Sequence, residues 1–235
     1  MALRIKAAIG AILIIGVAPL FAQPFLYQVR HQHRHGGGMG TLHVTLDSIS
    51  FDESGKQQEH SHEWKYTEIQ QLTLSPTTLR ILTYQGQKWQ LGRDRDYVFD
   101  HLPEDLPKTL YSMFAAKLDQ RFVAVLPDTA VRPQWQMGAK LRHGLEGSEG
   151  TLLVGDDRIV YQTEAAGQSR TWRFADIANI SMNGPFDFSI VTQEKSEYRH
   201  ASPTEFRFQL KEPLAENRYN DLWRKIQDFK DRTAF

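Results

Sequence analysis

Apolar and polar residues alternate with a period of two through most of the chain that follows residue 24. The segment TLHVTLDSISF, residues 41–51, alternates on either side of Asp47 and Ser48, as two strands joined by a hairpin turn would. β-branched and aromatic residues dominate the later runs, which favours strands. These runs are HEWKYTEIQQLTL, TTLRILTY, QKWQLG, YVF, GTLLV, RIVYQT, RTWRF, IANISM, FDFSIVT and EFRFQL. The pattern therefore predicts a mostly β protein.

The period becomes helical at two places. Apolar side chains there recur every three or four residues, which puts them on one face of a helix. They are Leu106, Leu110, Phe114 and Leu118 at the first place, and Tyr219, Leu222, Trp223, Ile226 and Phe229 at the second. We therefore expect two amphipathic helices whose apolar faces, including Phe114 and Trp223, pack in the core.

Two distant segments of the chain are nearly the same: RHGGGMGTLHV at 34–44 and RHGLEGSEGTLLV at 142–154. When the chain is shifted against itself by about 108 residues, apolar residues and glycines stay in register along a whole unit. The matched residues are Tyr27, Val29, His31, His33 and His35 with Trp135, Met137, Ala139, Leu141 and His143; after a slip of two residues, Gly40 with Gly150, Ile49 with Ile159 and Phe51 with Tyr161; and then Trp64 with Trp172, Ile69 with Ile177, Phe99 with Phe208 and Phe114 with Trp223. A period of this length is too long for a solenoid and indicates a duplicated domain.

The repeat predicts the domain organisation. We expect a first domain at 25–120, a linker at 121–132 and a second domain at 133–230. The linker contains VLPDTAVRP, whose two prolines favour an extended, stiff joint. The expected fold class is mostly β (α+β). Each domain would have about seven antiparallel strands, in a bent sheet or a barrel, capped by one C-terminal helix.

This element order resembles the pleckstrin-homology-like (PH-like) superfold, which includes the GRAM and bacterial PH families. The resemblance covers most of residues 25–230, twice, and depends on topology and on the paired positions Trp64/Trp172 and Phe114/Trp223. It implies binding of lipid headgroups, peptides or protein surfaces, and catalysis only exceptionally. Phosphoinositide-binding members carry a basic cluster across the first hairpin. Only Arg34 is near that turn here, so the resemblance does not extend to phosphoinositide binding.

The first residues, MALRIKAAIGAILIIGVAPLFAQ, differ from the rest. Arg4 and Lys6 precede an apolar run that ends at Ala22, which is the layout of a secretory signal peptide cleaved after Ala22. Leu20 is larger than the small residue that such a cleavage site prefers, so an uncleaved N-terminal anchor is the alternative. Either reading predicts an exported protein, periplasmic or extracellular. The layout is also similar to that of exported bacterial proteins of no assigned function.

Composition excludes several function classes. The formal net charge is zero, so no excess of cations points to nucleic acid. The absence of cysteine excludes disulfides, thiolate metal sites and cysteine nucleophiles. The chain has no nucleophile elbow, phosphate-binding loop or dinucleotide fingerprint. We therefore expect no enzymatic activity.

Five histidines form two clusters, HQHRH at 31–35 and HSH at 60–62. Alternate residues of a strand share a face, and paired imidazoles bind zinc or copper. This makes His31, His33, His60 and His62 candidate metal ligands. The alternative is a structural role, because the repeat alignment places Ala139 and Leu141 opposite the first two of them. The sequence leaves both interpretations open.

The sequence therefore predicts an exported, non-enzymatic binding or scaffold protein with no resident cofactor. Its expected partner is a protein or peptide of the cell envelope, with the membrane surface possible and nucleic acid excluded. The alternative function is a periplasmic metal-binding protein that uses the four histidines to hold zinc or copper.

Overall fold

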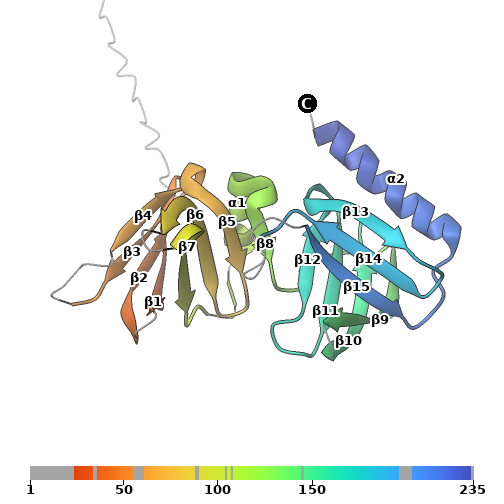
Figure 1. Ribbon diagram of the computed structural model, residues 1–235, viewed down its shortest axis with the longest axis horizontal. Helices are drawn as coiled ribbons and strands as arrows, with labels where there is room; N and C mark the ends of the chain where they lie inside the picture. The colour runs from red at the N-terminus through yellow and green to blue at the C-terminus, as the bar shows by residue number, and fades with distance from the viewer. Residues whose placement is uncertain are drawn as a thin grey trace, which may run out of the picture.

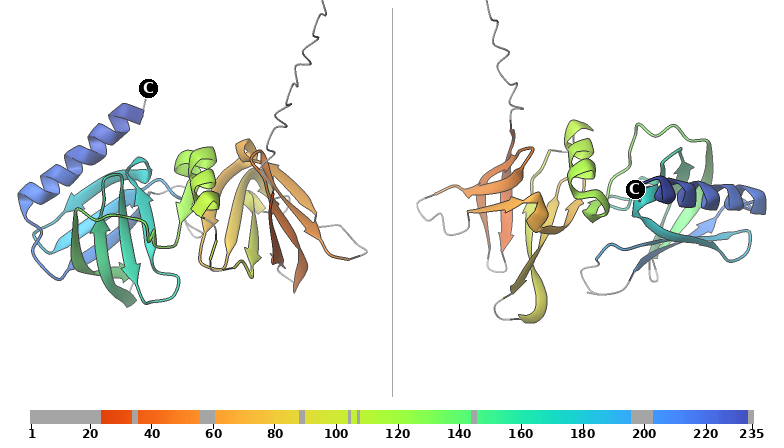
Figure 2. Two further views of the ribbon diagram at one scale, coloured as in Figure 1. Left: turned by 180° about the vertical axis from the view of Figure 1, so that it is seen from behind. Right: turned by 90° about the horizontal axis from the view of Figure 1, so that it is seen from above.

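The computed structural model describes residues 24–33, 36–55, 61–87, 90–103, 105–106, 108–143, 146–195 and 203–233 (Figure 1). It contains fifteen strands and two α-helices, α1 (Lys108–Leu118) and α2 (Glu216–Thr233). This confirms the predicted mostly β, α+β fold class. Two curved groups of strands lie next to each other, with α1 at their junction and α2 over the second group, as Figure 2 shows from two further directions.

The strands form two groups of seven with one strand between them. The first group is β1 (Phe25–His33), β2 (Gly36–Val44), β3 (Ser48–Glu53), β4 (His62–Lys65), β5 (Ile69–Leu74), β6 (Leu79–Gln87) and β7 (Gln90–Asp100). Next comes β8 (Phe122–Ala124). The second group is β9 (Trp135–His143), β10 (Glu146–Val154), β11 (Arg158–Thr163), β12 (Arg170–Arg173), β13 (Ile177–Met182), β14 (Asp187–Thr192) and β15 (Thr204–Leu210).

Both groups have the same strand order. The order in space is β4-β3-β2-β1-β7-β6-β5 in the first group and β12-β11-β10-β9-β15-β14-β13 in the second. A helix follows the seventh strand in each. Among the described strands, β4 does not pair with β5, and β12 does not pair with β13. Of the two expected forms, the bent open sheet is therefore the one observed, and neither group closes into a barrel.

Local features repeat as well. Ile49 pairs with Trp64 across β3 and β4, and Ile159 pairs with Trp172 across β11 and β12. A short 3₁₀ turn follows each tryptophan, η1 (Tyr66–Glu68) and η3 (Phe174–Asp176). The strand after each turn begins with a register shift, between Ile69 and Gln71 in β5 and between Ile177 and Asn179 in β13. The strand pairing gives a shift of 108 residues for Trp64 and Ile69, as in the sequence alignment, and of 109 for Thr83 and Phe99.

The register of β1 corrects the alignment made from the sequence. His31 pairs with Gly38 and Phe99, whereas Leu141 pairs with Ser148 and Phe208. Because Phe99 and Phe208 are equivalent, His31 is equivalent to Leu141 and not to Ala139. The two-residue slip therefore lies between the third and fourth strands of each group. A shift of two keeps every strand residue on the same face, so the apolar pattern could not reveal the error.

The repeated glycine of the two similar segments has a packing role. A Cβ at Gly40 would lie 2.5 Å from the ring of Phe51, and one at Gly150 would lie 2.9 Å from the ring of Tyr161. Each would also overlap a main-chain oxygen of the neighbouring strand. In both groups, glycine on the second strand therefore allows an aromatic ring of the third strand to lie across it.

Each group has its own apolar core. On α1, Leu110, Phe114 and Leu118 are buried, as predicted. On α2, Leu222 and Ile226 are buried, but Trp223 is 42% exposed. The prediction that Trp223 belongs to the core is therefore wrong. Adjacent residues on an α-helix point about 100° apart, so the face that buries Leu222 and Ile226 turns Trp223 outward.

Three residues of the expected linker form β8, which joins the two groups. β8 runs parallel to β5, with Leu72 opposite Phe122, and pairs with β12 only between Ala124 and Thr171. All three residues of β8 are buried. The result is one continuous sheet of fifteen strands, and the division into two domains stays a prediction. Among the described residues, neither helix has both the length and the apolar character that crossing a bilayer would need.

Hydrogen bonds at two further places connect the two halves of the chain. The side-chain amide of Gln71 on β5 donates to the carbonyl of Lys195 (3.2 Å) and accepts from the N–H of Lys195 (2.7 Å). The guanidinium of Arg173 on β12 donates to the carbonyl of Ala115 on α1 (3.0 Å). The segment that follows β14 and the turn that follows β12 are thereby held against the first group.

Candidate binding site

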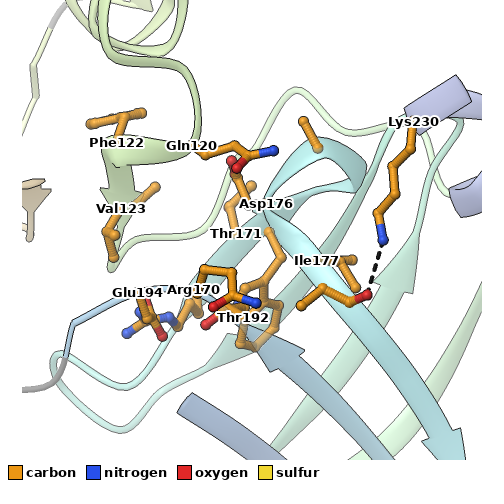
Figure 3. A pocket seen from close by; sticks show the side chains of 15 residues that line it. Gln120, Phe122, Val123, Arg170, Thr171, Asp176, Ile177, Thr192, Glu194 and Lys230 are labelled. Atoms are coloured by element: carbon orange, nitrogen blue, oxygen red, sulfur yellow. Dashed lines mark hydrogen bonds and ion pairs between the residues drawn. The ribbon is translucent and has the colours of Figure 1, made fainter. Parts of the chain in front are cut away.

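A hollow of about 310 Å³ lies where β8 and β12 separate, and we call it the seam hollow (Figure 3). One wall is β8, and the other walls are β12, the turn η3, the start of β13 and the end of β14. Lys230 of α2 reaches into it from the helix side. Its volume is near the lower limit for pockets that bind small molecules or short peptide segments.

A nearly buried ion pair forms one side of the hollow. The guanidinium of Arg170 pairs with the carboxylate of Glu194, and their side chains are only 15% and 9% exposed. The same guanidinium lies over the ring of Phe206, 4.6 Å from its centroid. Stacking and pairing together hold Arg170 in one orientation. This part of the site is rigid and carries no net charge.

A second ion pair lies above it. Arg173 donates to Asp176 through Nε (2.8 Å) and Nη2 (2.7 Å), and these contacts close the turn η3. Burial raises the pKa of Asp176, and the hydrogen bonds from Arg173 oppose that change. The carboxylate of Asp176 is therefore compensated within the protein.

Four polar atoms of residues that line the hollow are shielded from solvent and have no hydrogen-bond partner among the described residues. They are Arg170 Nε, Trp172 Nε1, Thr192 Oγ1 and Glu194 Oε1. Thr192 and Trp172 are each only 2% exposed. Buried polar groups in proteins nearly always have partners, because leaving one without a hydrogen bond costs about 1–3 kcal/mol. Four such atoms beside one hollow make it the candidate place for a polar ligand, which would reach them after the side chains that cover them move.

The first group of strands offers a comparison for Thr192. Thr83 on β6 occupies the equivalent position, since it pairs with Ile69 as Thr192 pairs with Ile177. Thr83 is buried too, at 1% exposed, but its hydroxyl donates to the carbonyl of Arg95 (3.1 Å). The hydroxyl without a partner is therefore a feature of the second group and not of the fold.

None of these residues was predicted from the sequence as part of a site, and Trp172 was noted only as the match of Trp64 in the repeat. Arg170 and Trp172 stand in RTWRF, and Thr192 and Glu194 in FDFSIVTQE, which indicate only strands. The available signal was the interruption of strand-like runs by charged residues, but that pattern is equally typical of a solvent-facing edge. Only the folded sheet brings these residues together beside β8, which the other half of the chain contributes.

The histidines predicted as metal ligands are only partly described. His31 on β1 is buried and stacks on Phe99, with ring centroids 5.0 Å apart. His62 on β4 lies against Tyr97 at 4.9 Å, and His31 also contacts Tyr97 at 5.7 Å. The structure thus brings these two histidines to the same aromatic cluster. The side chain of His33 and all of His60 lie outside the described residues.

Within the described part of the chain, no group of three or more potential metal ligands occurs. The four-histidine site stays a prediction, and the structure suggests a direct test. His31→Leu copies Leu141 at the equivalent position of the second group, with similar volume. We expect it to change the free energy of unfolding by less than about 1.5 kcal/mol. We also expect equimolar zinc to leave the melting temperature of both proteins unchanged in a thermal melt. A rise in the parent that His31→Leu abolishes would instead support the metal-binding alternative.

A larger hollow of about 840 Å³ lies between α1 and the segment 126–130. Its charged residues are paired, since Arg158 contacts both Asp128 and Asp157. Burial raises the pKa of Tyr111, which lines it, to about 12, so its hydroxyl stays neutral. None of its described lining residues has a buried polar side-chain atom without a hydrogen-bond partner. The seam hollow is therefore the better candidate for recognition.

No family model matches the chain, and no curated protein matches it. Among solved structures, the Spt16D Pob3N heterodimer is similar over 83% of this chain and 99% of that chain, with 10% identity and a TM-score of 0.33. The C-terminal domain of an unknown protein from Leishmania infantum is similar over 51% of this chain and 97% of that chain, with 10% identity and a TM-score of 0.32. Likeness at these TM-scores bears on neither ligand nor partner, so the function has to be argued from the seam hollow.

Proposed function

We propose that this chain is a non-enzymatic binding protein that takes a segment of polypeptide into the seam hollow. The observation that carries the proposal is the set of four buried polar atoms without partners. Arg170 Nε and Trp172 Nε1 can only donate a hydrogen bond, the carboxylate oxygen Glu194 Oε1 can only accept one, and the hydroxyl of Thr192 can do either. A peptide group carries one N–H and one C=O, so an extended segment supplies both kinds of partner.

The shape of the site supports the same ligand. The ladder between β8 and β12 consists of a single residue pair, after which the two strands diverge around the hollow. An extended peptide binds well beside strand edges, since main-chain hydrogen bonds give affinity and pockets give specificity. A membrane surface fits less well, because the polar groups of the hollow are buried and balanced in sign.

The proposal also includes two predictions made from the sequence, the PH-like fold and export. The PH-like assignment is supported by the strand order of each group and by the helix after its seventh strand. Export is supported only by the charged and apolar pattern of residues 1–22. For a PH-like protein that is exported, the proposed partner is a protein or peptide of the cell envelope.

Affinity selection tests the binding function. The protein is immobilised and exposed to a random hexapeptide library, and retained peptides are identified by mass spectrometry. We expect enrichment by the parent protein and a clear loss with Thr192→Val, which removes the unpartnered hydroxyl with little change in volume. The matched control is Thr83→Val at the equivalent buried position, which should retain the same peptides as the parent if it stays folded. Retention by the parent no better than by Thr192→Val would refute the proposal.

A further inference from the structure

The charged side chains of the seam hollow are balanced in number, but one of them has no ion-pair partner among the described residues. Four charged side chains line it: Arg170, Asp176, Glu194 and Lys230. Arg170 is paired with Glu194, and Asp176 is paired with Arg173, which lies just outside. Lys230 has no carboxylate partner among the described residues; its ammonium donates to the carbonyl of Ala178 (3.0 Å). One positive charge is therefore left facing the hollow.

Lys230 faces the unpartnered atoms from across the hollow. Figure 3 shows its side chain descending from α2, while Arg170, Thr192 and Glu194 gather on the opposite side, at the strands. Burial lowers the pKa of Lys230, because part of its hydration has been removed. An ammonium has three donors and only one is used here, so an anionic group could replace the lost water.

We infer, on the basis of the proposed peptide binding, that the segment recognised is a polypeptide C-terminus. The terminal carboxylate lies at Lys230. The last peptide group lies on the strand side, where its N–H donates to Glu194 Oε1 and its C=O accepts from Arg170 Nε or Trp172 Nε1. A C-terminus is the part of a peptide that carries one negative charge next to a peptide group, which matches the one uncompensated cation beside a mixed set of donors and acceptors.

Other parts of a polypeptide fit less well. An N-terminal ammonium would repel Lys230 and would supply no acceptor for it. An internal segment would fill the donors and acceptors at the strands but would leave the ammonium with its charge uncompensated. Both of these ligands would leave the partly buried ammonium of Lys230 without a counter-ion. A terminal carboxylate supplies that counter-ion.

The test compares two libraries that differ in one group. Random hexapeptides with a free C-terminal carboxylate and the same peptides with an amidated C-terminus are passed over the full-length protein. A hydrogen bond to a charged group contributes more than one to a neutral group, so we expect the free acids to be retained about tenfold better. Equal retention of both libraries would overturn the inference and leave the binding function intact. Failure to retain either library would overturn both.

Substitutions of Lys230 test whether its ammonium causes the preference for peptides with a free carboxylate. Lys230→Met should remove the preference for the free acid, and Lys230→Arg should preserve it. Lys225→Met is the matched control on the same helix, because Lys225 is exposed and donates to Gln134 on a different face. A preference that survives in a folded Lys230→Met protein would contradict the assignment to Lys230.

A last arm separates a polypeptide terminus from a small carboxylic acid. N-acetylalanine carries the same carboxylate and one peptide group but no further chain. We expect it to compete with the free-acid hexapeptides only weakly. Competition as strong as that of the hexapeptides themselves would show that the ligand is a small carboxylate and not a polypeptide.

Discussion

Replacing Leu222 with alanine is expected to lower the free energy of unfolding by about 2–5 kcal/mol. The side chain is 2% exposed and packs in the core of the second group, so its loss leaves a cavity that the sheet cannot easily fill. Trp223→Ala, at the next position, should change the free energy by less than about 1 kcal/mol, because the larger tryptophan side chain is 42% exposed. The smaller residue is therefore expected to matter more than the larger one.

Urea denaturation followed by circular dichroism measures both changes without depending on tryptophan fluorescence, which one of the substitutions would alter. Ile226→Ala serves as a second core variant on the same helix face and should resemble Leu222→Ala. If Trp223→Ala is as destabilising as Leu222→Ala, the helix is rotated from the orientation described. The number of transitions also tests the predicted domain division: two would support separate domains, whereas one would show that β8 makes the halves a single unit.

Removing one partner of the ion pair in the seam hollow has the other large expected effect. Arg170→Leu should lower the free energy of unfolding by about 3–5 kcal/mol, the usual result of leaving a buried charge without its partner. The carboxylate of Glu194 would then have lost its cation at a position where its side chain is only 9% exposed. Peptide retention should be lost as well, because the donor side of the hollow disappears.

The double variant Arg170→Leu/Glu194→Leu is the control. Two apolar residues in place of a buried pair are often neutral for stability, so most of the loss should be recovered. Chemical denaturation of the parent, the two single variants and the double variant forms a double-mutant cycle, which isolates the coupling between the two charges. If the two single effects simply add in the double variant, the pair is solvated and the hollow is wetter than its burial indicates. Peptide binding should stay absent in the double variant even where stability returns.

Much of the fold was predictable because it depends on local patterns. The period of two along the strands and the period near four in the helices gave the elements, and the repeated apolar positions gave two similar groups of seven strands. The repeated Gly40 and Gly150 were visible as a motif, and the structure supplies their reason, an aromatic ring lying across each. These features are set by residues close in sequence or by residues that match across the repeat.

Other features were ambiguous for reasons that the pattern itself explains. A shift of two residues in β1 preserves the face of every side chain, so His31 could be matched with Ala139 or with Leu141 on apolar character alone. Trp223 adjoins Leu222 at the border of the helix face, where the spacing allows either orientation. The strand β8 is only three residues long and is followed by Pro127 and Pro133, so its composition favoured a linker.

The sequence by itself determined most of the strands, both helices, most of the core positions and the absence of cysteine chemistry. It did not determine the site. Arg170, Trp172, Thr192 and Glu194 lie beside one hollow only because β8, from the other half of the chain, forms another wall of it, and Lys230 joins them only because α2 folds back along β13. Burial and the loss of hydration are properties of surfaces brought together across the whole chain. No local pattern records them, and for that reason the tertiary structure alone decided where the proposed site lies.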